Sequence, residues 1–269
     1  MAEPRYDTPE PFKVDIPERA LIDLDERLRR WRPGPAIVDD GSWASGTDPD
    51  FLAELVEYWR HGYDWQRCQE AINRWPNYLV DIDSQRIHFI REPGTEVEGA
   101  PRPTPLVLTH GWPGSIVEFL HIVDVLAHPE NHGGDSLDAF DVIVPSLPGY
   151  GFSGPPVRAD GTTGPIGPRA IADLWHRLIH EKLNYHRPFG AQGGDWGAAV
   201  TTQIGRNGGH CVGIHTNMPF GRPPKDLGEP TPEELAALER LSYYQRWDSG
   251  YAKQQSTRPQ TLGYGLVDS

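Results

Sequence analysis

One aspartate lies where the sequence turns sharply from a strand into a helix. The segment FGAQGGDWGAA (189–199) predicts a short strand, a glycine turn, Asp195 at the turn, and a helix directly after it. Small residues suit this position because larger side chains would block so tight a turn. A carboxylate nucleophile attacks a tetrahedral carbon and forms an alkyl ester, so its substrates would be epoxides or haloalkanes rather than esters or amides. The alternative is an aspartate that only caps the helix.

A second motif, HGWPGS (110–115), directly follows a predicted buried strand. We predict that the backbone N–H groups of Trp112 and Trp196 converge on the Asp195 carboxylate, hold its charge and later stabilise an oxyanion. His110, Trp112 and Trp196 are also the candidate substrate-binding residues. For His110 a structural hydrogen-bonding role is favoured, because that is the commoner role of a histidine after a buried strand.

Buried strands alternate with helices in the part of the chain that carries these motifs. Short strands are expected at 78–82, 86–90, 106–108 and 142–144, with a helix at 116–126. The first two strands form a hairpin around Asp83 and Ser84. The alternation is typical of an α/β fold, in which helices cover both faces of a mostly parallel sheet. Ligands of such sheets bind at the carboxyl ends of the strands, where Trp112 and Asp195 are expected.

Three helices are predicted before Pro76, in a segment rich in tryptophan. The first begins near Glu18, the second opens with Asp48 as its N-cap, and the third begins near Asp64. The second helix is expected to bury Phe51, Leu55 and Trp59. The segment is interpreted as packing structure without chemistry of its own.

The composition excludes several classes of protein. Acidic residues outnumber basic ones 38 to 25, so the surface repels nucleic acid. No stretch approaches the roughly 20 apolar residues of a membrane helix, and the N-terminus has no apolar signal core. Cys68 and Cys211 lie far apart and form no disulfide framework, which fits a reducing compartment. We therefore expect a cytoplasmic protein without a membrane-spanning segment, and the sequence leaves its oligomeric state open.

Histidines give only a weak metal signal. His176 and His180 are four residues apart, as on a metal-binding helix, but no glutamate follows His176 and no third ligand is evident. We expect neither a metal nor a cofactor.

Four motifs in a fixed order resemble the microsomal and juvenile-hormone branch of the epoxide hydrolases: HGWPGS (110–115), LPGYGFSGPP (147–156), GGDWG (193–197) and HTNMP (215–219). The resemblance implies an α/β-hydrolase core at 77–222, preceded by an N-terminal helical meander at 1–76. It also implies the beginning of a helical cap at 223–269. In that cap Tyr251 would be the first of two tyrosines that hold the oxygen of a small-molecule epoxide and donate a proton to it.

The resemblance also implies that something is missing after residue 269. Family members continue with the rest of the cap, the final core strands, a second tyrosine, a late acidic residue and a histidine that activates water. All eleven histidines here lie at or before His215, so none can be placed in that role. We expect a truncated, poorly stable chain with an exposed sheet edge near 212–214, which forms the alkyl ester but turns over inefficiently.

Two alternatives stay open. One is an inactive fragment that acts by association, which the missing histidine favours. The other is a haloalkane dehalogenase, in which the ring N–H of Trp196 would hold the leaving halide. The N-terminal helices and Tyr251 speak against the dehalogenase.

Overall fold

The computed structural model describes residues 5–35, 37, 41–208, 210–221 and 228–268. The chain divides into two compact units. The first, the α/β unit, comprises Met1–Ile16 and Tyr63–Phe220, and the second, the helical unit, comprises Pro17–Gly62 and Gly221–Ser269. The predicted boundaries at residues 76 and 222 remain predictions, and the second lies outside the described residues.

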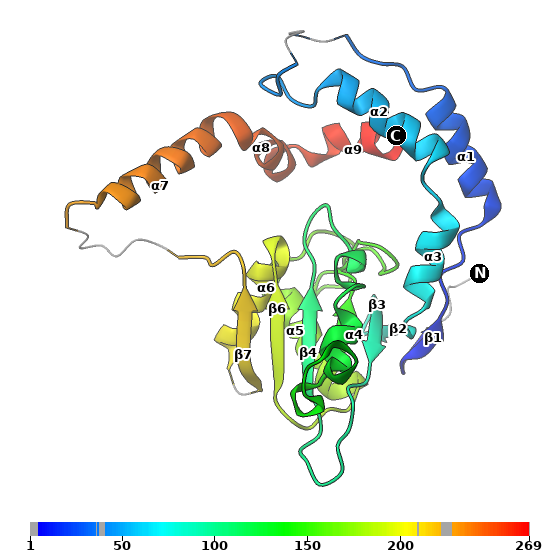
Figure 1. The fold of residues 1–269 in the computed structure, drawn as a ribbon, viewed down its shortest axis with the longest axis vertical. Coiled ribbons are helices and arrows are strands. Elements are labelled where there is room, and N and C mark those ends of the chain that lie inside the picture. The colour runs from blue at the N-terminus through cyan, green and yellow to red at the C-terminus, as the bar shows by residue number, and fades with distance from the viewer. Residues whose placement is uncertain (1–4, 36, 38–40, 209, 222–227, 269) are drawn as a thin grey trace. The chain divides into compact units, whose positions relative to one another are not determined.

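The α/β unit is built on a sheet of seven strands within the described residues (Figure 1). The strands are β1 (Glu10–Phe12), β2 (Asn77–Ile82), β3 (Gln85–Glu92), β4 (Thr104–Thr109), β5 (Phe140–Pro145), β6 (Phe189–Gly193) and β7 (Cys211–Thr216), in the spatial order β1-β2-β3-β5-β4-β6-β7. Strands β5, β4, β6 and β7 run parallel, and β1, β2 and β3 are antiparallel to their neighbours. The expected α/β-hydrolase type of sheet and the β2–β3 hairpin are thereby confirmed, whereas β1 was not predicted.

Helices cover both faces of this sheet (Figure 1). One face packs against α5 (Pro168–Arg177), the π-helical turn η4 (Leu178–Lys182) and α6 (Asp195–Asn207), with Trp175 fully buried at its centre. The other face packs against α3 (Trp65–Asn73), the 3-10 helix η1 (Ile116–Phe119) and α4 (Val123–Ala127). Two further 3-10 turns, η2 (Pro129–His132) and η3 (Ser136–Asp138), precede β5. The single helix expected at 116–126 is therefore two short helices.

Strand β7 is the last strand of the sheet order, and its side chains are largely exposed. Val212 is 66% exposed and Ile214 is 45% exposed. The expectation of an exposed apolar strand at this edge is confirmed. Such an edge offers unpaired backbone groups to any further strand.

The helical unit contains α1 (Glu18–Arg29), α2 (Pro49–His61), α7 (Pro232–Tyr243), the π-helical turn η5 (Tyr244–Asp248), α8 (Gly250–Thr257) and α9 (Pro259–Asp268). The predicted starts of α1, α2 and α3 are confirmed. The predicted inner face of α2 is wrong, because Phe51, Leu55 and Trp59 are each about half exposed while Val56 is 8% exposed. The buried face is therefore displaced by one residue, which is about 100° around an α-helix.

Candidate active site

Asp195 is held in a strained turn at the carboxyl end of β6. It is the first residue of α6 and has a φ of 49°, a left-handed conformation that non-glycine residues rarely adopt. Such strain persists only when the surrounding structure enforces it, and it is concentrated at functional sites. Gly197 allows α6 to begin this close to the sheet, because a Cβ at this position would overlap the carbonyl oxygen of Thr109 at the end of β4. The close approach of α6 to β4 thus requires glycine.

The HGWPGS loop meets Asp195 because β4 and β6 are parallel neighbours. Thr109 pairs with Gly193, so the segments that follow both strands leave the sheet side by side. The Trp112 N–H donates a hydrogen bond of 2.8 Å to Asp195 Oδ1. A Cβ on Gly111 would overlap the same carboxylate. One of the two predicted backbone donors therefore bonds the Asp195 carboxyl group. Hydrogen bonds to a carboxylate are stronger than those to a neutral acceptor.

The second predicted donor, Trp196, occupies the first turn of α6. The first N–H groups of a helix have no partner within the helix and point toward its N-terminus. Among the hydrogen bonds found in the described part of the chain, none joins this N–H to Asp195. Its place in an oxyanion hole remains a prediction. The Trp196 side chain is 54% exposed.

His110 is buried in this arrangement, and both of its ring nitrogens have hydrogen-bond partners. It is 1% exposed, its Nδ1 lies 2.9 Å from the Gly111 carbonyl oxygen, and its Nε2 accepts a hydrogen bond of 3.0 Å from the Leu147 N–H. These partners fix the neutral tautomer with the proton on Nδ1. Burial lowers the pKa of His110, and the hydrogen bond to Gly111 opposes that shift. Because both ring nitrogens are engaged, the structure favours the predicted structural role and lends no support to substrate binding by His110.

Two residues near Asp195 were missed by the sequence analysis. Glu118 lies in η1, and burial raises the pKa of its carboxyl group, with the charge of Asp195 adding to the shift and a backbone hydrogen bond from Ser115 opposing it. Tyr150 is also affected: burial raises the pKa of its hydroxyl and the charge of Asp195 adds to the effect. The spacing of Ser115 and Glu118 is a capping-box signal that could have drawn attention to the first residue.

Tyr251 lies on α8 in the helical unit. It is 50% exposed, and its hydroxyl oxygen lies 3.3 Å from that of Tyr244. Asp195 belongs to the other unit, so the role of Tyr251 as proton donor remains a prediction.

A third histidine, His210, lies beside the pair His176 and His180, which the sequence did not predict. The rings of His176 and His180 lie 6.2 Å apart, and the ring of His210 lies 4.6 Å from that of His180. Even so, no group of three potential metal-ligating side chains in the described ranges could hold an ion. Within the same ranges, no helix has the length and apolar character to cross a membrane.

Two family models together match most of this chain. Residues 9–119 match the family described as "Epoxide hydrolase N terminus", and residues 104–264 match "alpha/beta hydrolase fold". A protein of Stigmatella aurantiaca (strain DW4/3-1) named "Putative epoxide hydrolase" is 43% identical over 263 residues, which cover 96% of this chain and 57% of that protein.

Two solved structures share the fold over nearly the whole chain. The epoxide hydrolase of Aspergillus niger superposes with a TM-score of 0.82 at 30% identity, covering 97% of this chain and 66% of the other. The juvenile hormone epoxide hydrolase of the silkworm Bombyx mori gives a TM-score of 0.75 at 29% identity, covering 98% and 61%. The chain thus spans less than two thirds of the length of these relatives. From its two family matches, its relatives and its fold, the chain belongs to the α/β-hydrolase family and, within it, to the epoxide hydrolases of the microsomal and juvenile-hormone type.

Proposed function

We propose that the chain opens a small-molecule epoxide through attack by Asp195, and that the resulting ester is hydrolysed to a vicinal diol. The observation that carries this proposal is the contact between the Trp112 N–H and Asp195 Oδ1 at a strained strand-to-helix turn. A residue that only capped α6 would need neither the left-handed conformation nor a donor from the neighbouring strand's loop. The geometry therefore supports a nucleophile rather than a cap.

The first half-reaction is a substitution at carbon. A carboxylate oxygen of Asp195 forms a bond to one oxirane carbon, and the bond from that carbon to the epoxide oxygen breaks. The electron pair goes to the epoxide oxygen, which needs a proton because an alkoxide leaves poorly. We assign this proton to the hydroxyl of Tyr251 on the strength of the family resemblance.

The second half-reaction is ester hydrolysis. Water adds to the carboxyl carbon of the Asp195 ester and loses one proton to solvent, so negative charge develops on the former carbonyl oxygen. The N–H of Trp112 is already aimed at one oxygen of this group, so it stabilises the charge without further rearrangement. Collapse of the adduct breaks the bond between the carboxyl carbon and the alkyl oxygen, which takes a proton from solvent and leaves as the second hydroxyl of the diol. The carboxyl group that remains gives its proton to the Tyr251 phenolate, so both groups return to their starting states.

The test is intact-mass spectrometry of the purified chain after incubation with styrene oxide, with the diol measured in the same sample. Adduct and diol report the two half-reactions separately. An adduct on Asp195 supports the first half-reaction and diol supports the second, whereas adduct with little diol would match the expected inefficient turnover. Asp195→Asn, which keeps an oxygen for the Trp112 N–H to bond, should lower adduct formation at least about 1,000-fold, because an amide is a far weaker nucleophile.

The same assay separates the proposed acid from its neighbour. Tyr251→Phe should slow ester formation about 100-fold, within the range for loss of a general acid, whereas the matched Tyr244→Phe should have a much smaller effect. Absence of both adduct and diol from the folded wild-type chain would instead favour an inactive fragment. Halide release from a haloalkane without diol from an epoxide would favour a dehalogenase. Cytoplasmic location stays a prediction.

A further inference from the structure

An asparagine followed by a glycine ends helix α6. Asn207 is the last residue of the helix, and Gly208 caps it with a φ of 65°, outside the helical conformation. Both residues are exposed to solvent. Glycine has no side chain that would shield its own backbone nitrogen or restrict its rotation. The backbone nitrogen of Gly208 can therefore approach the carboxamide carbon of Asn207.

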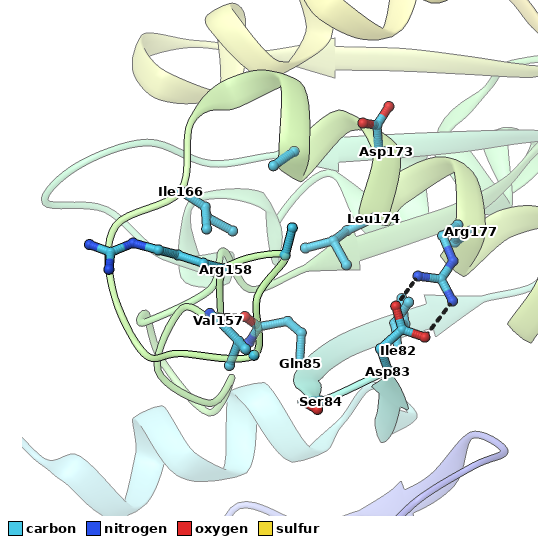
Figure 2. Close-up of a pocket in the computed structure, with 13 residues that line it drawn as sticks. Ile82, Asp83, Ser84, Gln85, Val157, Arg158, Ile166, Asp173, Leu174 and Arg177 are labelled. Atoms are coloured by element: carbon cyan, nitrogen blue, oxygen red, sulfur yellow. Dashed lines mark hydrogen bonds and ion pairs between the residues drawn. The ribbon is translucent and has the colours of Figure 1, made fainter.

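The carboxamide of Asn207 connects α6 to α5. Its Nδ2 donates a hydrogen bond of 3.1 Å to Asp173 Oδ1. Asp173 and Arg177 line a cavity of about 250 Å³ at the β2–β3 turn, where Arg177 donates to both carboxylate oxygens of Asp83, at 2.6 and 3.0 Å. Figure 2 shows Asp173 pointing away from this ion pair. Asp173 thus has the Asn207 amide as its partner and does not share the cation.

We propose that Asn207 is a modification site, at which the carboxamide is converted to a carboxylate with water as the co-reactant. The backbone nitrogen of Gly208 forms a bond to Asn207 Cγ and gives its proton to solvent. The bond from Cγ to Nδ2 then breaks, and the nitrogen takes up a proton and leaves as ammonia. Water opens the resulting cyclic imide at either of its two carbonyl carbons, which yields aspartate or isoaspartate.

The modification would reverse the sign of the contact between α5 and α6. A carboxylate at position 207 has no proton to donate to Asp173, so the hydrogen bond is lost and two like charges face each other. The carbonyl end of a helix also carries a partial negative charge, which disfavours a further negative charge in its last turn. Both effects loosen the end of α6.

This site is independent of the proposed epoxide chemistry. Asp195 is the first residue of α6 and Asn207 is the last. At about 1.5 Å per residue the two ends of this helix lie about 18 Å apart. The conversion needs only water, so it proceeds in the chain without substrate and whether or not Asp195 is a nucleophile.

The first test follows the conversion in the full chain. The protein is incubated in oxygen-18 water at pH 6, 7.5 and 9 and then digested in ordinary water, and the peptides are analysed by mass spectrometry. The label separates conversion during incubation from conversion during digestion. Asn131 and Asn184 are internal controls, because both are exposed and are followed by residues with large side chains.

We expect position 207 to take up oxygen-18 at least about 10-fold faster than either control, because only Asn207 precedes a glycine. The rate should rise with pH, since the attacking nitrogen must lose its proton. Asn207→Gln should stop the conversion, because its longer side chain would have to form a larger ring. Equal uptake at the three asparagines would overturn the proposal.

The second test measures the effect on the helix by amide hydrogen exchange in residues 204–207. Asn207→Asp introduces the carboxylate directly, and the matched Asn207→Ala removes the donor without adding charge. Exchange should be about fivefold faster in Asn207→Asp than in Asn207→Ala. Addition of Asp173→Asn to Asn207→Asp restores a donor and an acceptor and should return exchange to near the wild-type rate. Equal exchange in Asn207→Asp and Asn207→Ala, or no rescue by Asp173→Asn, would show that the new charge does not loosen α6.

Discussion

The α/β unit and the helical unit keep their side chains in place by different means. The described part of the α/β unit buries large side chains completely, among them Phe89, Trp175 and Phe189. In the helical unit Val56 is the only buried apolar side chain among the described residues. Its helices depend instead on caps and on surface ion pairs such as that of Asp23 and Arg27. Dense packing fixes side-chain positions far more strongly than surface ion pairs do.

The residues proposed for the chemistry lie in both units and are therefore packed to different degrees. Asp195 and the Trp112 N–H are positioned by strands whose neighbours are packed on both faces. Tyr251 lies on α8, in which no described residue is buried. Packing within the α/β unit is therefore enough to position the proposed nucleophile, whereas the proposed proton donor needs constraints that packing within α8 does not supply.

The largest expected effect comes from removing a core side chain. Trp175→Ala should lower the free energy of unfolding of the α/β unit by about 3–5 kcal/mol, because it leaves a cavity between α5 and the sheet and removes the hydrogen bond from Trp175 Nε1 to Thr109 Oγ1. The matched change Leu238→Ala, on the exposed face of α7, should change it by less than about 0.5 kcal/mol. Urea unfolding followed by circular dichroism measures both. Equal losses would show that the two units are stabilised in the same way.

The second prediction concerns the loss of folding stability at acidic pH. His88 is completely buried, with Nδ1 at 2.9 Å from Ser146 Oγ and Nε2 at 2.9 Å from Asn77 Oδ1. Burial lowers the pKa of His88 from 6.5 to about 3. The unfolded chain binds this proton below pH 6.5 and the folded one does not, so stability is fully present above pH 6.5 and is lost as the pH falls toward 3. The loss approaches about 1.4 kcal/mol per pH unit in that window.

The measurement is the free energy of unfolding from urea titrations at several pH values between 4 and 7. His88→Gln keeps a donor for Asn77 Oδ1 but cannot titrate, so the slope against pH should be shallower than in the wild type. His61→Gln, on the exposed surface of α2 beside Glu57, is the control for replacing a histidine that is not buried. A wild-type slope retained in His88→Gln would contradict the assignment and point to His110 or His176, whose pKa values burial also lowers.

The same contrast explains what the sequence could predict. The turn at Asp195 and the loop at Trp112 were predictable because each follows a short buried strand and contains glycines, and both features can be read from the sequence. The capping-box spacing marks Glu118 only as part of a helix start. Its relation to Asp195, like that of Tyr150, arises from the packing of η1 and of the loop after β5 and was not predictable. The error on α2 has a related cause: periodicity gives an apolar stripe, but the partner decides which edge of the stripe is buried.

The smallest expected effect tests whether a local cap acts locally. Thr231 Oγ1 accepts a hydrogen bond of 3.2 Å from the Glu234 N–H, and Glu234 Oε2 accepts one of 2.8 Å from the Thr231 N–H. In the α/β unit, Asp64 Oδ1 similarly accepts one of 2.9 Å from the Gln66 N–H at the start of α3. Removal of either cap, by Thr231→Ala or Asp64→Ala, should cost about 1 kcal/mol.

The two losses should nevertheless appear in different measurements. Helix α3 packs against the sheet through Ile72, so Asp64→Ala should lower the global unfolding free energy. Helix α7 has no buried residue among those described, so Thr231→Ala should speed amide hydrogen exchange within 232–243 about fivefold and leave global unfolding of the α/β unit unchanged. If Thr231→Ala lowered the stability of the α/β unit as much as Asp64→Ala does, the two units would unfold together, and Tyr251 would share the rigidity of the packed core.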